Sequence, residues 1–474
     1  MTKTLKFKNS QLIRKSDIPF VDFNEFALMV NDTHYRIANL FINQEEYKNN
    51  LYAVIADDKN AELHIIGTIV GNEYPSLTIK RPSVHMFERE IYENYGITPI
   101  NHPWLKPVRV NEEYEFLKSD DHQSHEVAVG PVHAGIIEPG HFRFLCQGER
   151  IMHLEIQLGW QHRGVEKMLK NNPNIWLAES ISGDTTIGHS MTFARSIEAL
   201  AGLKVCPRAK TIRKIALEME RMAIHIGDIG AIAGDIAYLM GAEVLGVTRT
   251  LVINTLLEIT GSRFGKGLMK IGGVNFDITD ELKYKITSML DEVDNRISEM
   301  CNAMFANATV LSRLENTGLV STKKAEEIGL VGPASRASGL KIDARIFDDY
   351  KNFEITNTTG GDVWARTYQR YLEIKQSKNL IITLLNNLKG KLETPTTKHN
   401  FEKDTMCIST TEGWRGEIQH IVITNPNGEI EQYKIKDPSF HNWQGLALAV
   451  RNNQISDFPV CNKSFNLSYC GFDL

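Results

Sequence analysis

Hydrophobic and polar positions alternate with a period of two in the first part of the chain. Residues 51–58 (LYAVIADD) and 62–71 (ELHIIGTIVG) carry β-branched side chains in an alternating pattern that is typical of half-buried strands. Residues 85–97 (HMFEREIYENYGI) follow with apolar and aromatic side chains three and four positions apart, which predicts a helix. We therefore predict that residues 1–108 form a small α/β domain.

The middle of the chain changes to helical spacing. Residues 209–241, 280–314 and 360–390 keep apolar side chains three and four positions apart over many turns, which predicts a bundle of at least three long helices. The least polar stretch, residues 227–247, is interrupted by three acidic residues. We interpret it as a buried helix rather than a membrane span, because a span needs about 18 or more apolar residues.

The last part of the chain returns to strands, since residues 413–440 form two alternating runs around an Asn-Pro-Asn-Gly turn at 425–428. Residues 109–128 are charged and weakly periodic, so we interpret them as a linker. The predicted fold class is α+β: a small α/β N-terminal domain at 1–108, then a mainly α-helical domain at 129–474 with minor β-elements.

Composition narrows the class of protein. A chain of 474 residues exceeds the size of a single core and predicts at least two domains. The net charge of −5 provides no broad basic field, so we expect no nucleic-acid partner. The first 17 residues lack the apolar region of a signal peptide, so we expect a cytoplasmic protein. Six cysteines are scattered without any C-x-x-C pair, which favours reduced thiols over a disulfide framework or a metal motif.

A series of motifs carries a family resemblance. The motifs are GPVHAGIIEPGHFRF (130–144), LGWQHRGVEKML (158–169), EMERMAIHIGDIGA (218–231), GPASRASGLKIDAR (332–345), GGDVWAR (360–366) and GWRGEI (413–418). Their order resembles the large subunit of energy-converting, membrane-bound [NiFe]-hydrogenases of the formate-hydrogenlyase type and the 49-kDa-type subunit of respiratory complex I. The first hundred residues, ending in FEREIYENYGITPINHPWLKPVRV, resemble the 30-kDa-type subunit of complex I fused in front.

The sequence departs from the hydrogenases where their metal is bound. The resemblance places the four metal-binding cysteines of the hydrogenases at Ser182, Thr185, Ser439 and Asn442, which we call the vacated frame. Hydroxyl and amide groups cannot replace the bridging thiolates that hold nickel and iron. We therefore expect no metal at these positions, no cofactor bound by this chain and no hydrogenase activity.

Two residues of the motif at 158–169 are candidates for contact with a partner's cofactor. The resemblance implies that His162 and Arg163 face the [4Fe–4S] cluster of a small subunit of the complex I 20-kDa type. A cation and an imidazole beside a cluster raise its potential by stabilising the added electron. The alternative is that Arg163 or Lys167 forms a surface ion pair with Glu166.

Three residues are candidate catalytic groups for proton transfer. Glu138 matches an acid that relays protons in the hydrogenases, but it could equally be a capping carboxylate ahead of Pro139. Asp184 lies inside the vacated frame and, with His189 and Arg415, could line a proton route or a quinone pocket. A plain salt bridge between Asp184 and Arg415 is the alternative.

Quinone binding does not carry over residue by residue. Complex I subunits use a His from an HPxxH loop and a Tyr, whereas this chain has a different loop at 133–141 and Gly183 or Asp184 at the tyrosine position. Quinone thus stays an open expectation.

The resemblance implies a subunit of a membrane-associated, complex I-related oxidoreductase that couples electron transfer to ion translocation. Its implied partners are the iron–sulfur small subunit, antiporter-like subunits and other membrane-arm subunits, which would hold it peripherally on the inner face of the cell membrane. The alternative is a non-redox scaffold or conformational coupling subunit of such a complex.

Overall fold

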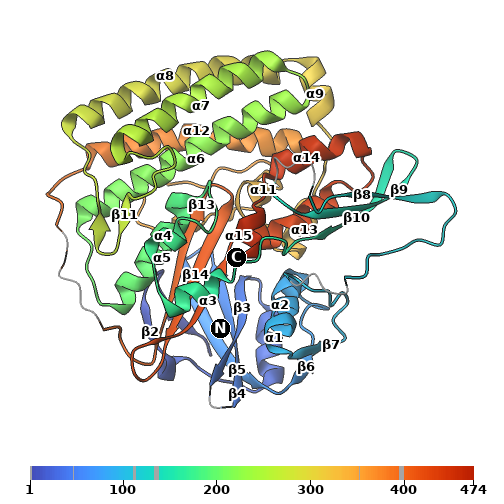
Figure 1. The fold of residues 1–474 in the computed structure, drawn as a ribbon, viewed down its shortest axis with the longest axis vertical. Helices are drawn as coiled ribbons and strands as arrows, with labels where there is room; N and C mark the ends of the chain where they lie inside the picture. The colour runs from blue at the N-terminus through green and yellow to red at the C-terminus, as the bar shows by residue number, and fades with distance from the viewer. Residues whose placement is uncertain are drawn as a thin grey trace.

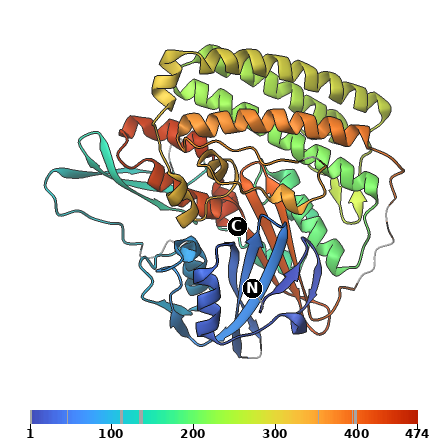
Figure 2. The ribbon, with the colours of Figure 1, turned by 180° about the vertical axis from the view of Figure 1, so that it is seen from behind.

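The computed structural model describes residues 3–474 except 46, 110–113, 133–137, 352, 394 and 396–399. Figure 1 shows the elements in three layers, with a bundle of long helices at one end and the N-terminal sheet at the other. A second sheet and the C-terminal helices lie between them, and the view from behind in Figure 2 shows the same order. The fold is α+β, as predicted.

The N-terminal sheet has the order β1-β5-β4-β3, formed by β1 (Leu5–Phe7), β5 (Glu62–Val70), β4 (Lys48–Asp57) and β3 (Arg36–Glu45). Its strands are antiparallel. The helices α1 (Phe23–Asp32) and α2 (His85–Tyr95) cover one face, and α2 ends at Gly96 in the left-handed conformation, as helices often do. The predicted strands and helix of this region are confirmed.

The other face of this sheet packs on a second sheet of order β15-β14-β13-β2. That sheet contains β13 (Thr405–Gly413), β14 (Gly416–Thr424), β15 (Ile430–Lys436) and β2 (Leu12–Arg14). Side chains such as Phe41 and Val54 meet Met406 and Ile421 in one apolar cluster. The hairpin predicted at 413–440 is confirmed. The two predicted domains share a core, and strand β2 of the first joins the sheet of the second.

The helical bundle consists of α6 (Pro207–Asp235), α7 (Leu239–Thr260), α8 (Asp280–Phe305) and α12 (Val363–Asn386). The single helix predicted through residue 241 is wrong, because the chain breaks at 236–238, where Ala237 has a φ of 60°. Within the described residues, α7 alone has the length and composition of a helix that could cross a membrane. It packs against α6 and α8, with a third of its most apolar window buried.

A smaller antiparallel sheet extends from the edge of the molecule, formed by β8 (Ser124–Val129), β9 (His141–Gln147) and β10 (Arg150–Gln157) (Figure 1). The predicted linker therefore ends in strand β8, which a run of small and polar side chains concealed. Upstream of it, the Leu117 N–H donates a hydrogen bond to Glu155. Residues 110–113 of the linker and 133–137 of the following motif lie outside the described residues.

The chain after Asn442 is part of the folded core, as its apolar density predicts. It forms α13 (Ser439–Ala449), α14 (Phe458–Phe465) and α15 (Tyr469–Asp473), and the side chains of Phe472 and Leu474 are buried. The remaining regular elements are β6 (Glu73–Pro75), β7 (Thr98–Ile100), α3 (Val165–Asn171), α4 (Ile175–Ala178), α5 (Thr186–Leu200), β11 (Met269–Lys270), β12 (Gly273–Val274), α9 (Ala308–Leu314), α10 (Thr322–Glu327) and α11 (Gly332–Ala337).

Candidate functional site

The structure brings three of the four residues of the vacated frame together. Ser182 and Thr185 precede α5, and Ser439 begins α13. The Ser182 and Ser468 hydroxyl oxygens are 3.0 Å apart, and the Ser468 N–H donates to Ser439 Oγ at 2.9 Å. The amide of Asn442 points elsewhere: it bonds the backbone N–H and C=O of Val331 at 3.1 and 3.0 Å.

An ion pair closes the vacated frame. Arg415, in the turn between β13 and β14, donates from both terminal nitrogens to the two carboxylate oxygens of Asp184, at 2.6 Å each. The same guanidinium donates to Thr185 Oγ1 at 3.0 Å and lies over the Trp414 ring at 3.9 Å. Burial raises the pKa of Asp184, but Arg415 outweighs it, and the pKa falls below its ordinary value. The salt-bridge alternative for Asp184 is therefore confirmed.

The hydroxyl groups of the vacated frame already have hydrogen-bond partners within the protein. The hydroxyls of Ser182 and Thr185 donate to Asp184 at 3.0 and 3.2 Å. The nearby Cys470 thiol lies 3.5 Å from Ser468 Oγ, and burial raises the pKa of that thiol, which keeps it protonated. Such neutral, hydrogen-bonded groups suit water or a small polar molecule rather than a soft metal ion. The sequence analysis did not place Ser468 and Cys470 at this site, because only the folding of α13–α15 brings them close to Ser439.

A line of buried polar side chains, which we call the histidine relay, runs beneath the vacated frame. His189 Nε2 lies 3.0 Å from Asp437 Oδ2, and His189 Nδ1 lies 3.2 Å from His420 Nε2. His420 Nδ1 in turn lies 2.8 Å from the Tyr433 hydroxyl. Asp437 also accepts the N–H of Ser439, which joins the relay to the vacated frame.

The protonation states in the histidine relay follow from burial and partners. Burial holds the pKa of His420 well below and that of Tyr433 well above the ordinary values. Burial also acts to raise the pKa of Asp437, but the His189 hydrogen bond and nearby Arg415 bring it below its ordinary value.

The Tyr433 hydroxyl can donate at one end, and the Asp437 carboxylate can only accept at the other. The hydrogen bonds therefore all point the same way, from Tyr433 through His420 and His189 to Asp437. The arrangement can pass a proton toward the vacated frame. Sequence analysis selected His189 but missed His420 and Tyr433, which look like ordinary strand positions.

Glu138 acts as a capping group in this structure. Its carboxylate accepts the backbone N–H of Cys470 at 3.2 Å, in the first turn of α15. This geometry matches the capping alternative from the sequence analysis. The loop segment 133–137, next to Glu138, lies outside the described residues.

His162 and Arg163 lie on an exposed loop that is tied to the vacated frame. His162 Nδ1 is 2.7 Å from the Asp473 carbonyl, and Arg163 donates to the carbonyls of Ser180 and Ile181, both at 3.0 Å. In the described part of the chain, Arg163 forms no ion pair with Glu166, which instead accepts the Ile435 N–H. The loop and the helices after it expose three large apolar side chains: Trp160, Met168 and Trp176.

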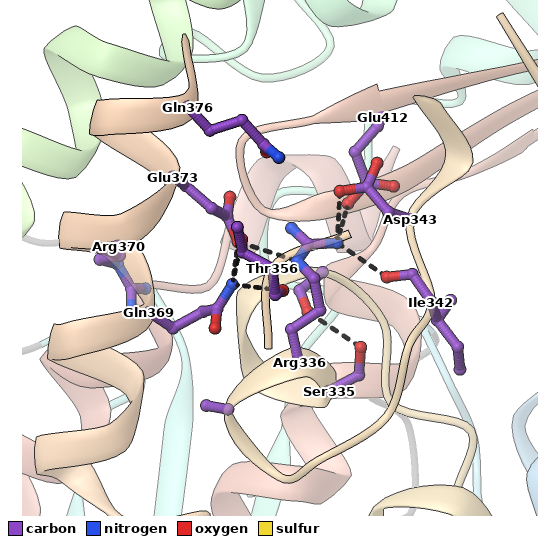
Figure 3. Close-up of polar contacts among 12 residues, drawn as sticks. Ser335, Arg336, Ile342, Asp343, Thr356, Gln369, Arg370, Glu373, Gln376 and Glu412 are labelled. Carbon is purple, nitrogen blue, oxygen red and sulfur yellow. Dashed lines mark hydrogen bonds and ion pairs between the residues drawn. The ribbon is translucent and has the colours of Figure 1, made fainter. Parts of the chain in front are cut away.

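A second set of ion pairs, the arginine cluster, joins α11 and α12 to β13. Arg336 bonds Glu373 at 2.8 Å, Glu412 at 2.7 Å and Asp343 at 3.2 Å (Figure 3). Despite burial, Arg336 holds the pKa of Glu373 well below its ordinary value. Burial and Asp343 raise the pKa of Glu412 to about 7.

The arginine cluster also helps to position the turn that carries Arg415. Glu412 is the second-last residue of β13, close to this turn, and Gly332 of α11 packs directly against the turn. A Cβ at Gly332 would lie 2.0 Å from the Arg415 carbonyl oxygen, so only glycine permits this approach. These contacts indicate that Arg336 is a structural ion-pairing residue.

Known proteins match both parts of this architecture. Residues 235–409 match the family model for the 49-kDa subunit of respiratory-chain NADH dehydrogenase, and residues 24–125 match that for its 30-kDa subunit. The chain is 30% identical to membrane-bound hydrogenase subunit alpha of Pyrococcus furiosus, over 72% of this chain and 85% of that protein. The chain belongs to this hydrogenase and complex I family.

Two other relatives extend the comparison. Formate hydrogenlyase subunit 5 of Escherichia coli is 26% identical and aligns with 91% of this chain and 83% of its own length. A chain from the solved structure of the membrane-bound sulfane sulfur reductase, an archaeal respiratory membrane complex, shares the fold with a TM-score of 0.66. It is 22% identical, and the match covers 75% of this chain and all of that chain. The family contains subunits of membrane-bound complexes, and this member has hydroxyls and an amide in its vacated frame.

Proposed function

We propose that this chain is the large subunit of a membrane-associated, complex I-related oxidoreductase without hydrogenase activity. It docks a [4Fe–4S] small subunit and takes part in coupling electron transfer to ion translocation. The observation that carries the proposal is the closed vacated frame beside an intact His162–Arg163 loop. Ser182, Thr185, Ser439 and Asn442 offer no thiolate for nickel, whereas His162 and Arg163 lie on the loop that would face the cluster.

A nickel–iron centre does not fit the residues present. The hydroxyls of Ser182 and Thr185 are committed to Asp184, and the Asn442 amide is committed to Val331. Neither group forms a thiolate, so no soft bridging ligand comes from these positions. Once the Asp184–Arg415 pair opens, the Arg415 guanidinium and the neutral hydroxyls would suit a ligand with carbonyl or anionic oxygens, such as a quinone headgroup.

Proton supply to this site would come from the histidine relay. A substrate reduced here takes up protons as well as electrons. The Tyr433 to Asp437 direction would move a proton toward Ser439 and the vacated frame, with His189 as the central group. Asp184 acts with Arg415 as the closure of the site, and Glu138 holds α15 in place.

The docking part of the proposal rests on the exposed loop and α3. Arg163 contacts the carbonyls immediately before Ser182, so a cluster held against this loop would lie beside the vacated frame. Exposed Trp160 and Met168 supply the apolar contacts that a stable interface needs. Antiporter-like subunits would then hold the complex on the cytoplasmic face of the membrane.

The experiment is purification of tagged protein from gently solubilised native membranes, with identification of the co-purifying chains and a count of iron and nickel. Iron–sulfur and antiporter-like chains with iron but without nickel are the expected result. Stoichiometric nickel, or a protein isolated alone and without iron, would contradict the proposal.

Two matched variants sharpen this experiment. Arg163→Glu should release the small subunit, whereas Lys170→Glu, an exposed charge reversal at the end of α3, should retain it. A complete complex that transfers no electrons through its clusters would favour the scaffold alternative.

A further inference from the structure

Three potential metal ligands gather at the end of the β4–β5 hairpin, on the face of the N-terminal sheet that carries α1. Asp57 and Glu62 are cross-strand partners, and His64 follows two residues after Glu62, so all three point to the same side. One ligand atom from each lies within 4.8 Å of the others. The side chains of Asp57 and His64 are buried, whereas that of Glu62 is 41% exposed.

The imidazole of His64 is fixed with one nitrogen unused. Its Nδ1 lies 3.0 Å from Thr4 Oγ1, which orients the ring. Its Nε2 is buried, has no hydrogen-bond partner among the described residues, and lies 3.9 Å from Glu62 Oε2. A buried imidazole nitrogen without a partner, close to two carboxylates, is an arrangement that a cation would complete.

The cluster already attracts a positive charge. The Lys6 ammonium lies 2.9 Å from Glu62 Oε2, on a long side chain that is 61% exposed and free to swing into water. Asp57 is held in place because its carboxylate accepts bonds from the Lys59 and Asn60 backbone N–H groups. An incoming ion therefore meets two anchored ligands and one mobile carboxylate.

We propose that Asp57, Glu62 and His64 form a binding site for a divalent transition-metal ion, zinc in the first instance, with solvent completing the coordination. One imidazole nitrogen and two carboxylates are ligands that zinc accepts at about 2.0–2.2 Å. At those bond lengths the ligand atoms stand a little over 3 Å apart, and exposed Glu62 can close the remaining gap. A surface cleft of about 400 Å³, lined in part by Tyr35, Asp57 and Asn60, reaches one of the three ligands, Asp57.

This site is separate from the vacated frame and departs from the sequence-based expectation that the chain binds no metal. The ligands are spaced Asp-x4-Glu-x-His across a tight turn, a pattern too short to stand out in the sequence. The hairpin register, rather than the spacing alone, places the three side chains together.

The test uses the full-length protein, stripped with a chelator and titrated with zinc chloride by isothermal titration calorimetry. The wild type should bind one equivalent that Glu62→Gln and His64→Ala each weaken at least tenfold. His34→Ala is the matched control, because this exposed imidazole lines the same cleft outside the ligand set, and it should bind like the wild type. Lys6→Met should bind severalfold more tightly, because the competing ammonium is gone.

Equal zinc stoichiometry and affinity in the wild type, Glu62→Gln and His64→Ala would overturn the proposal. So would weaker binding in Lys6→Met, because the ion would then not take the place of the ammonium. Glu62→Gln alters an exposed side chain and retains the hairpin, so its circular dichroism and unfolding midpoint separate lost binding from lost folding.

Discussion

The vacated frame and the arginine cluster use the same chemistry in different surroundings. In both, an arginine guanidinium donates short charge-assisted hydrogen bonds to carboxylates. The partners of Arg336 are all fully buried, whereas the Asp184 side chain keeps 37% of its surface exposed. Breaking a buried pair leaves an uncompensated charge, whereas a pair at the solvent boundary can open into water. The vacated frame is thus the region where an ion pair can open at low cost.

The largest effect should come from breaking the arginine cluster. Arg336→Ala leaves Glu373, Glu412 and Asp343 without their shared cation, so the free energy of unfolding should fall by about 3–5 kcal/mol in denaturant titration. Arg296→Ala removes an exposed pair with Glu292 and should cost less than about 0.5 kcal/mol. Equal losses in the two variants would mean that burial does not distinguish these ion pairs.

The next effect concerns Glu220, a buried residue that supports the start of α5. Glu220 accepts the N–H groups of Ile187 and Gly188 at the start of α5, and burial raises its pKa to about 8. Between the ordinary value and about 8, the folded state holds a proton that the unfolded chain has lost. The stability of the wild type should therefore fall as pH rises through this window.

Glu220→Gln mimics the protonated form and should escape this loss. Its advantage over the wild type should grow by about 4 kcal/mol between pH 5 and 9, measured by urea unfolding midpoints. The control is Glu243→Gln, which changes an exposed carboxylate and should follow the wild-type profile. Parallel profiles for Glu220→Gln and the wild type would show that Glu220 is ionised in the fold.

A smaller effect is expected at the mouth of the vacated frame. Asp184→Ala removes the partner of Arg415, but the guanidinium still reaches Thr185 and the Asn466 carbonyl. The free energy of unfolding should fall by only about 1 kcal/mol, and exchange of the Arg415 side-chain protons should accelerate in NMR spectra. A loss as large as that of Arg336→Ala would place Asp184 among the buried pairs.

The smallest effect should come from the end of the histidine relay. Tyr433→Phe deletes one hydrogen bond and should cost about 0.5–1 kcal/mol. It also leaves His420 Nδ1 without its donor, so the ring-nitrogen chemical shifts of His420 should move while those of distant His34 stay constant. Unchanged His420 shifts would remove Tyr433 from the relay.

Local patterns in the sequence predicted the main elements but not all of their boundaries. Periodicity located the strands near residues 51–71 and the long helices, because burial of one face imposes those spacings. The break at Ala237 escaped, since apolar side chains continue on both sides of it without a proline. Strand β8 was not predicted because its apolar residues, Val127, Ala128 and Val129, are consecutive and do not alternate with polar ones.

The candidate site was predictable only where family position fixes a residue. Ser182, Thr185, Ser439, Asp184 and His189 could be selected, and the Asp184–Arg415 pair could be offered as an alternative. The partners that complete the site come from distant segments, which no local pattern connects: Ser468, His420 and Tyr433. The direction of the Asn442 amide toward Val331 depends likewise on how α13 docks beside α11.

Strand β2 has a consequence for biosynthesis. It leaves the ribosome long before its partner β13, which lies roughly 390 residues further along the chain. At about 5–20 residues per second, Leu12–Arg14 waits tens of seconds with its backbone groups unpaired. The second sheet therefore assembles late. A nascent chain stalled before residue 405 would expose an unpaired strand, which could bind chaperones or pair with chains on neighbouring polysomes.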